Sequence, residues 1–227
     1  MARLKLGVLL SGRGSNLRAL ITAAKDPAYP AKIVSVISDR PEAPGLAYAR
    51  TARLPAVAIS HSDRAFFAAE AAGFLREHRV ELVCLAGFMR VLDPALVESW
   101  RDRMVNIHPS LLPAFPGLHP QRQALAAGVK FTGCTVHFVR QEVDAGPIIA
   151  QAIVATRADD DEASLSARIL RIEHRLYPLT VRLIAEGRVR VVANKVEIDG
   201  WQAPKISALN PREPRRMPSA RVVGVGL

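Results

Sequence analysis

The chain has 227 residues, of which 49% are hydrophobic and 23% are charged. This balance excludes a mostly disordered chain, because enough apolar surface is available to form a core. Lys and Arg total 31 against 21 Asp and Glu, and the formal net charge of +10 favours anionic partners such as phosphates, polycarboxylates or nucleic acid. Cys84 and Cys134 lie in apolar runs. We expect buried thiols in a reducing compartment rather than a disulfide framework or a zinc site.

No apolar run approaches the roughly 18 residues that a membrane-spanning helix needs. The first apolar run, 4–10, looks like a secretion signal only briefly, because it ends at Ser11-Gly12-Arg13. A buried strand explains this run better. We therefore expect a cytoplasmic protein that makes no membrane contact.

Strands and helices are expected to alternate over the first 110 residues. The predicted strands are 4–10, 33–38, 56–59, 80–86 and 104–107. The predicted helices are 15–25, 45–53 and one that follows the capping residues His61-Ser62-Asp63 and ends near His78. This alternation predicts an α/β, Rossmann-like fold with a mostly parallel sheet and helices on both faces. Ligands of such sheets bind at the carboxyl ends of the strands, which here lead into 11–16, 87–92 and 106–113.

The pattern becomes mixed after Pro113. A helix is expected over 121–127, followed by two strands, 134–139 and 148–156, on either side of the turn-like Asp144-Ala145-Gly146-Pro147. Apolar residues then recur at steps of four and three from Leu165 to Leu183, which is typical of one helix face. Pro178 lies inside this stripe and should bend or break the helix. A hairpin of 189–192 and 195–198 should follow.

Residues 210–227 are rich in Pro and Arg and are predicted to form a flexible basic tail. We expect residues 1–209 to form a single domain. Its first half, 1–110, would be a mononucleotide-binding unit, and its second half, 111–209, would complete the fold.

The segment Ser11-Gly12-Arg13-Gly14-Ser15-Asn16 joins the first predicted strand to the first helix. Glycines let backbone N–H groups approach an anion, and a helix N-terminus favours a phosphate. Ser15 or Asn16 is expected to cap the helix. The alternative is an ordinary strand-to-helix turn, and the spacing alone does not decide between the two. The Walker lysine and the third glycine of the dinucleotide fingerprint are both missing, which argues against ATP hydrolysis and NAD binding.

Asn106 and His108 leave a predicted strand on the same side and enter the Pro-restricted segment Pro109-Ser110-Leu111-Leu112-Pro113. An amide can donate to an oxyanion, and an imidazole can carry a proton near neutral pH. Asp144 is the best carboxylate to favour the charged form of such a histidine. The alternative is that these side chains satisfy loop backbone groups. The sequence also leaves open whether His137 and His119 belong to a site or are an ordinary buried and an ordinary loop histidine.

Four segments together resemble a known family. They are Gly12-Arg13-Gly14-Ser15-Asn16-Leu17, Gly87-Phe88-Met89-Arg90, Asn106-Ile107-His108-Pro109-Ser110-Leu111-Leu112-Pro113 and Asp144-Ala145-Gly146-Pro147. In this order and spacing they resemble the phosphoribosylglycinamide formyltransferases, folate-dependent enzymes of purine synthesis. The resemblance extends from about Lys5 to Trp201. It implies formyl transfer from 10-formyltetrahydrofolate, as a co-substrate, to the amine of N1-(5-phospho-D-ribosyl)glycinamide, with no metal.

The resemblance also implies roles for individual residues. It assigns catalysis to Asn106, His108 and Asp144, through a tetrahedral intermediate whose oxyanion Asn106 and protonated His108 stabilise. It assigns the ribonucleotide to Gly12, Arg13, Gly14, Ser15, Asn16 and Glu173. It assigns the folate to Arg64, Met89, Arg90, Val91, Leu92, Asn106, Arg140, Gln141, Glu142, Val143 and Asp144. One departure is the loop Gly117-Leu118-His119, which continues as Pro120-Gln121 where the family often has Thr and His.

Two other enzymes with similar catalytic segments are alternatives. Formyltetrahydrofolate hydrolases carry an extra N-terminal domain and methionyl-tRNA formyltransferases an extra C-terminal domain, and we expect neither in this sequence. A third hypothesis is a non-enzymatic module that binds nucleotide or RNA through the tail residues Arg212, Arg215, Arg216 and Arg221. No aromatic residues are interleaved with these arginines, which argues against nucleic acid as a partner. We expect small-molecule partners and a monomer or homodimer.

Overall fold

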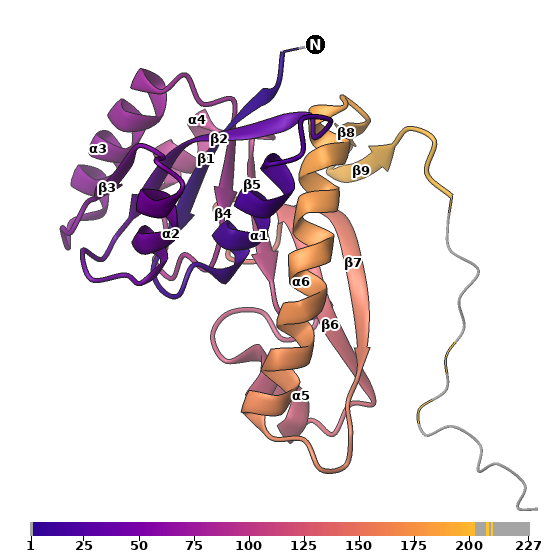
Figure 1. Ribbon diagram of the computed structural model, residues 1–227. Helices are drawn as coiled ribbons and strands as arrows, with labels where there is room; N and C mark the ends of the chain where they lie inside the picture. Colours follow the sequence, from indigo (N-terminus) through magenta and orange to yellow (C-terminus); the bar gives the residue numbers. More distant parts are fainter. Residues whose placement is uncertain (1, 203–207, 209, 211–227) are drawn as a thin grey trace, which may run out of the picture.

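The structure, a computed structural model, describes residues 2–202, 208 and 210. The largest sheet of this part of the chain has seven strands in the order β3-β2-β1-β4-β5-β6-β7. The strands are β1 (Leu4–Leu10), β2 (Ala31–Ser38), β3 (Ala56–Ala58), β4 (Leu82–Leu85), β5 (Met104–His108), β6 (Phe131–Phe138) and β7 (Ile148–Ala155). The pairs among β1 to β5 are parallel, whereas β6 and β7 join in antiparallel pairs. The predicted mostly parallel α/β sheet with a mixed C-terminal part is confirmed (Figure 1).

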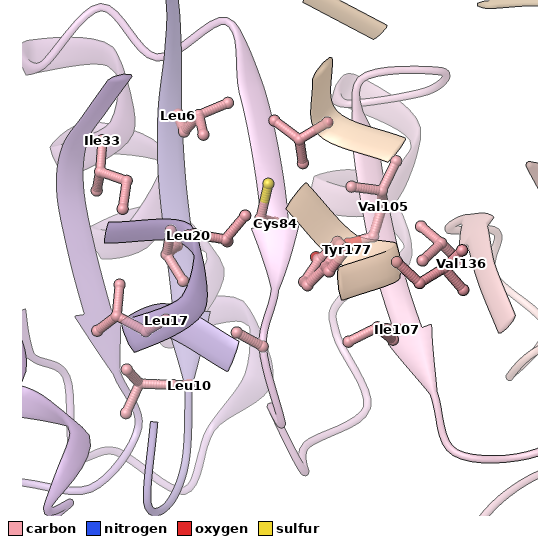
Figure 2. Packing of buried hydrophobic residues seen from close by; sticks show 14 of the residues in the cluster. Leu6, Leu10, Leu17, Leu20, Ile33, Cys84, Val105, Ile107, Val136 and Tyr177 are labelled. Atoms are coloured by element: carbon pink, nitrogen blue, oxygen red, sulfur yellow. The ribbon is translucent and has the colours of Figure 1, made fainter. Parts of the chain in front are cut away.

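Helices cover both faces of this sheet. They are α1 (Ser15–Ala24), α2 (Gly45–Thr51), α3 (Arg64–Glu77), α4 (Pro94–Ser99), α5 (Pro120–Ala126) and α6 (Glu162–Ala185). One core contains Leu17 of α1, Leu46 of α2 and Tyr177 of α6, and Figure 2 shows part of it. A second core contains Phe67 of α3 and Leu96 of α4. The two cores explain why β4 is a continuous apolar run, since all its residues are buried.

Most predicted elements agree with the structure to within a few residues, and the strand over 4–10 and the hairpin over 189–192 and 195–198 agree fully. That hairpin is β8 (Val189–Val192) and β9 (Lys195–Ile198), which pair as a separate two-stranded sheet. Within the described residues, none of the helices is long and apolar enough to cross a membrane. The predicted tail lies outside the described residues, apart from Asn210.

Two features of the helices differ from expectation. The sequence analysis did not predict α4, which has only six residues and two buried side chains, too few to show a periodicity. Pro178 was predicted to bend or break the last helix, and a break is ruled out because α6 continues through the proline to Ala185. Buried residues on both sides of the proline hold the helix against the sheet, and the Tyr29 hydroxyl donates to the Pro178 carbonyl at 2.8 Å. Tertiary packing outweighs the local cost of the proline.

Tyr177 connects α6 by hydrogen bonding to β4 and β5, the two strands that lead to the candidate site. Its side chain is fully buried, and its hydroxyl is 2.9 Å from the Leu85 carbonyl oxygen of β4 and 3.2 Å from the Val105 carbonyl oxygen of β5. In Figure 2 the ring lies next to Val105 and Ile107. A buried hydroxyl that serves two strands fixes the position of α6 against the sheet.

Replacing Tyr177 with Phe removes this donor and keeps the ring. We expect the free energy of unfolding to fall by about 1 kcal/mol, because buried carbonyls lose a hydrogen bond. Tyr48→Phe is the matched control at a half-buried tyrosine of α2, and it should change the free energy by less than about 0.5 kcal/mol. Urea denaturation of both variants measures the difference, and equal losses would contradict the assigned role of the Tyr177 hydroxyl.

Candidate active site

Asn106, His108 and Asp144 meet at the carboxyl end of β5. Asn106 and His108 lie on the same side of the strand, as the alternation predicts. Asp144 lies between β6 and β7 in a left-handed backbone conformation, with φ of 56°. Its Oδ1 is 3.5 Å from Asn106 Nδ2, and its Oδ2 is 3.3 Å from His108 Nδ1. The structure thus brings Asp144 together with Asn106 and His108, which lie far from it in the sequence.

Both ring nitrogens of His108 face hydrogen-bond acceptors. Nδ1 faces Asp144, and Nε2 is 2.9 Å from the Phe115 carbonyl oxygen. Burial lowers the pKa of the His108 imidazole below its ordinary value, and it outweighs the Phe115 carbonyl and the Asp144 carboxylate, which act in the opposite direction. Burial therefore favours the neutral ring of His108, which is the form that can accept a proton.

Asp144 is held in its ionised form. Burial raises the pKa of its carboxyl, but the contact with His137, the hydrogen bond from the Gly117 N–H and the adjacent His108 together leave the pKa below its ordinary value. The Gly117 nitrogen is 2.8 Å from Asp144 Oδ2. Among the described residues, no group of three or more His, Cys, Asp or Glu side chains could hold a metal ion.

His137, whose role the sequence leaves open, lies in this cluster. The antiparallel register of β5 and β6 places it opposite Asn106. Its Nδ1 is 2.9 Å from the Phe138 carbonyl oxygen. Its Nε2 is 3.3 Å from Asn106 Nδ2 and 3.6 Å from Asp144 Oδ1. His137 is thus a buried neighbour of both Asn106 and Asp144.

Backbone groups of the loop 115–119 complete the cluster, and sequence reasoning missed them. The Phe115 carbonyl and the Gly117 N–H contact His108 and Asp144, as given above. Phe115, Gly117 and His119 all have positive φ values. Only the Gly-rich, Pro-rich composition of the loop could have indicated a special backbone conformation, because backbone partners leave no side-chain pattern in a sequence.

A cavity of about 460 Å³ opens beside these residues. It reaches Asn106, His108 and His137 at one end, and its wall includes His119, the second histidine that the sequence leaves open. Of the residues expected at the folate, those that line it are Met89, Arg90, Val91, Leu92, Asn106, Arg140, Gln141, Glu142, Val143 and Asp144. Further lining residues that were not predicted are Phe88, Val97, Leu118, Pro120 and Gln121.

Arg64 does not line the cavity. Its guanidinium instead donates to the Leu92 carbonyl at 2.5 Å. Arg90, in the cavity wall, donates in return to the carbonyls of His61 and Ser62, which precede α3, at 2.6 and 3.0 Å. The two arginines therefore fasten the start of α3 to the segment that forms one wall of the cavity.

The Gly-rich turn lies at the start of α1. Gly14 is the N-cap of this helix with φ of 71°, and no side chain caps the helix, so the expectation that Ser15 or Asn16 caps it is wrong. A Cβ atom on Gly14 would lie 2.5 Å from the Gly45 Cα, so α2 packs too closely for any other residue. The uncapped N–H groups of α1 remain available to an anion.

Asn16 instead turns toward α6. Its Nδ2 donates to Glu173 Oε2 at 2.8 Å, and both side chains are buried. Burial raises the pKa of the Glu173 carboxyl, although the hydrogen bond from Asn16 acts against this effect. The Oδ1 of Asn16 is buried without a hydrogen-bond partner among the described residues. The structure thus joins two of the residues expected at the ribonucleotide.

Ser11 links the Gly-rich turn to the cavity, a contact that the sequence did not indicate. Its nitrogen donates to the Gly87 carbonyl at 3.1 Å, and its Oγ accepts from the Met89 nitrogen at 2.8 Å. Gly87 and Met89 line the cavity. The turn and the cavity are therefore neighbouring sites at the carboxyl edge of the sheet.

Comparisons with known proteins agree with this arrangement. Residues 4–181 match the model of the family described as formyl transferase. The chain belongs to the formyl transferase family. The resemblance noted in the sequence is thereby confirmed, and the Gly-rich turn, the Asn106 and His108 pair and the Asp144 segment all lie within the matched residues.

Individual formyl transferases give the same result. Phosphoribosylglycinamide formyltransferase from Escherichia coli (strain K12) is 41% identical over 200 residues, which cover 87% of this chain and 94% of that protein. Glycinamide ribonucleotide transformylase 1 from Symbiobacterium toebii, a solved structure, has a TM-score of 0.83 and 46% identity, covering 86% of this chain and 94% of that one.

Longer relatives also match. The trifunctional purine biosynthetic protein adenosine-3 from Drosophila melanogaster is 51% identical over 190 residues, or 82% of this chain. Those residues are only 14% of the fly protein, so this chain spans about a seventh of that relative's length.

Glu173→Gln tests the buried pair with Asn16. A Gln side chain can accept from Asn16 Nδ2 and also donate to the unpartnered Asn16 Oδ1. Because the pKa of Glu173 is raised in the folded state, its ionisation costs stability as the pH rises above the ordinary value of about 4.3. The variant should therefore be more stable than the parent protein at pH 8, by about 1 kcal/mol or more, and the advantage should shrink at pH 5.

Urea denaturation at both pH values measures this effect. Glu186→Gln, at the exposed C-terminus of α6, is the control and should show no such pH-dependent gain. A Glu173→Gln protein that is less stable than the parent at pH 8 would contradict the interpretation.

Proposed function

We propose that this protein transfers the formyl group of 10-formyltetrahydrofolate to the amine of N1-(5-phospho-D-ribosyl)glycinamide, in purine biosynthesis. The products are the N2-formyl ribonucleotide and tetrahydrofolate. The observation that carries the proposal is the Asn106, His108 and Asp144 cluster at the end of a cavity, in a chain of the formyl transferase family. The E. coli relative that matches nearly end to end carries this activity in its name.

The Gly-rich turn supports a site for the ribonucleotide. An uncapped helix N-terminus with nearby glycines suits a phosphate, and Gly12 to Asn16 provide both here. Arg13 is exposed within the turn and can add positive charge. Glu173, held by Asn16, offers a buried acceptor for hydroxyl groups. The contact of Ser11 with Met89 places the turn beside the cavity that the catalytic cluster lines.

The cavity supports a site for the folate. Met89, Val91, Leu118 and Val143 line it and are each more than half exposed. Apolar side chains exposed together around a cavity indicate a ligand that covers them. A flat pterin ring has the size and polarity for this cavity. Arg90 and Arg140, on its wall, suit the carboxylates of a folate. Arg64 would act at the rim, through its contact with Leu92.

The chemistry follows from the protonation of the cluster. The neutral amine attacks the formyl carbon, and negative charge develops on the formyl oxygen. Asn106 Nδ2 donates to this oxyanion, because its contact with Asp144 Oδ1, at 3.5 Å, is long enough to exchange for a closer one. The amine then loses a proton to neutral His108, and the resulting imidazolium, beside ionised Asp144, stabilises the oxyanion. The intermediate collapses when the folate N10 leaves with a proton from this pair, and the carbonyl re-forms on the new amide.

The remaining expectations stay predictions. They are a cytoplasmic location, a monomer or homodimer, and the division of the chain at residues 110 and 209.

The proposal is tested by mixing purified protein with 10-formyltetrahydrofolate, with and without the ribonucleotide, and following the deformylated folate by its absorbance. We expect turnover only when the ribonucleotide is present. Equal turnover without it would show a hydrolase instead and would overturn the proposal. A folded protein with no turnover in either mixture would overturn it as well.

Asp144→Asn should reduce kcat at least about 100-fold, because it removes the charge that stabilises the imidazolium form of His108. The amide can still accept from the Gly117 N–H, so the fold and the far-ultraviolet circular dichroism should not change. The control Asp199→Asn removes a carboxylate after β9, away from the cluster, and should keep the parental kcat. Near-parental kcat in Asp144→Asn would remove Asp144 from the mechanism.

A further inference from the structure

We propose that Gln123 is a positioning residue, which acts through the loop 115–119 to hold His108 and Asp144 in their catalytic arrangement. The inference deepens the proposed function and rests on it. Gln123 lies on α5, has no contact with the catalytic side chains and does not line the cavity. Neither the sequence patterns nor the catalytic cluster itself singled it out.

The side chain of Gln123 spans two carbonyls of the loop. Its Nε2 donates to the Leu118 carbonyl at 2.8 Å and to the Pro116 carbonyl at 3.2 Å. These two carbonyls flank Gly117. The Gln123 amide therefore holds the backbone on both sides of Gly117, whose N–H donates to Asp144. We call these two hydrogen bonds from Gln123 the clamp.

The loop is also the part of the backbone that holds His108. The Phe115 carbonyl, which faces His108 Nε2, immediately precedes Pro116. A single short segment thus contacts both members of the pair, with one acceptor for the histidine and one donor for the carboxylate. If the segment moves, both contacts change together.

The loop needs external bonds to keep its shape. Phe115 and His119 are non-glycine residues in the left-handed region, with φ values of 55° and 56°. This conformation is unfavourable for a residue with a Cβ atom, and it persists where surrounding contacts impose it. The clamp from Gln123 lies between the two. His119 has a second, longer contact, 3.6 Å from Glu162, at an exposed position.

The chemistry that the clamp requires is hydrogen-bond donation. Gln123→Met keeps the length and loses the donors, and Gln123→Glu places a carboxylate against two carbonyls. Gln123→Lys keeps a donor at similar length. We expect kcat to fall about 10-fold in the Met variant and further in the Glu variant, and to stay within about 3-fold in the Lys variant. The KM for the ribonucleotide should change less than about 3-fold throughout, because the Gly-rich turn is untouched.

A second readout needs no substrate. Nuclear magnetic resonance titration of the His108 ring reports its surroundings, which include the charged or titratable Asp144 and His137 and the Phe115 carbonyl. The Phe115 carbonyl and Asp144 both raise the pKa of His108. Losing the clamp should therefore shift the His108 titration to lower pH in the Met and Glu variants, and the Lys variant should titrate like the parent.

The control is Arg122→Met. Arg122 neighbours Gln123 on α5, and its side-chain contact among the described residues is an exposed ion pair with Glu162, at 3.1 Å. This variant should leave both kcat and the His108 titration unchanged. It shows how much a general loosening of α5 contributes.

The outcomes separate this inference from the proposed function. If the parent protein does not transfer formyl groups but the Met and Glu variants shift the His108 titration, the proposed function fails and the clamp stands. If the parent is active and the Met and Glu variants match it in both kcat and titration, the clamp is wrong. Losses that are equal in the Met and Lys variants would also overturn it, because they would show that packing rather than donation matters. If the Glu variant does not fold, the Met and Lys pair decides.

Discussion

The arrangement of the site depends on one buried carboxylate. Asp144 receives the Gly117 N–H on one oxygen and lies within 3.6 Å of Asn106, His108 and His137. A carboxylate taken out of water is stable only where donors and positive charge surround it. Strands β5 and β6 and the loop 115–119 must therefore meet at this point, because β5 supplies Asn106 and His108, β6 supplies His137 and the loop supplies the Gly117 N–H. The low pKa of Asp144 is the electrostatic consequence of that meeting.

The change from parallel to antiparallel pairing in the sheet brings these groups together around Asp144. β4 and β5 are parallel, so their carboxyl ends open onto the same edge. β6 then returns antiparallel beside β5 and places His137 opposite Asn106, and the segment after it carries Asp144 back over the end of β5. The parallel half, by contrast, supplies an uncapped helix N-terminus after β1. Ser11 joins the two halves, so that the proposed phosphate site and the proposed proton-transfer site share one edge of the sheet.

The sequence is informative where chemistry and periodicity coincide. The run 4–10, apolar except for Lys5, predicts its strand to the residue, because its last five residues are all buried. Alternation places Asn106 and His108 on one side. The sequence gives no indication of the contacts that backbone groups make, as at Phe115 and Gly117. Nearly every residue has a carbonyl and an N–H, so these contacts leave no pattern of residue types. It misleads where tertiary contacts take over, as at Asn16, which bonds to Glu173 rather than capping its helix.

The central claim is a direct transfer between two ligands bound side by side, without release of the formyl group to water. The most direct measurement uses 10-formyltetrahydrofolate labelled with carbon-13 in the formyl group, together with the ribonucleotide, and counts the label in products by nuclear magnetic resonance. We expect one labelled amide on the ribonucleotide for each tetrahydrofolate formed, with no labelled formate above the uncatalysed background. Labelled formate that accumulates in step with tetrahydrofolate would contradict it.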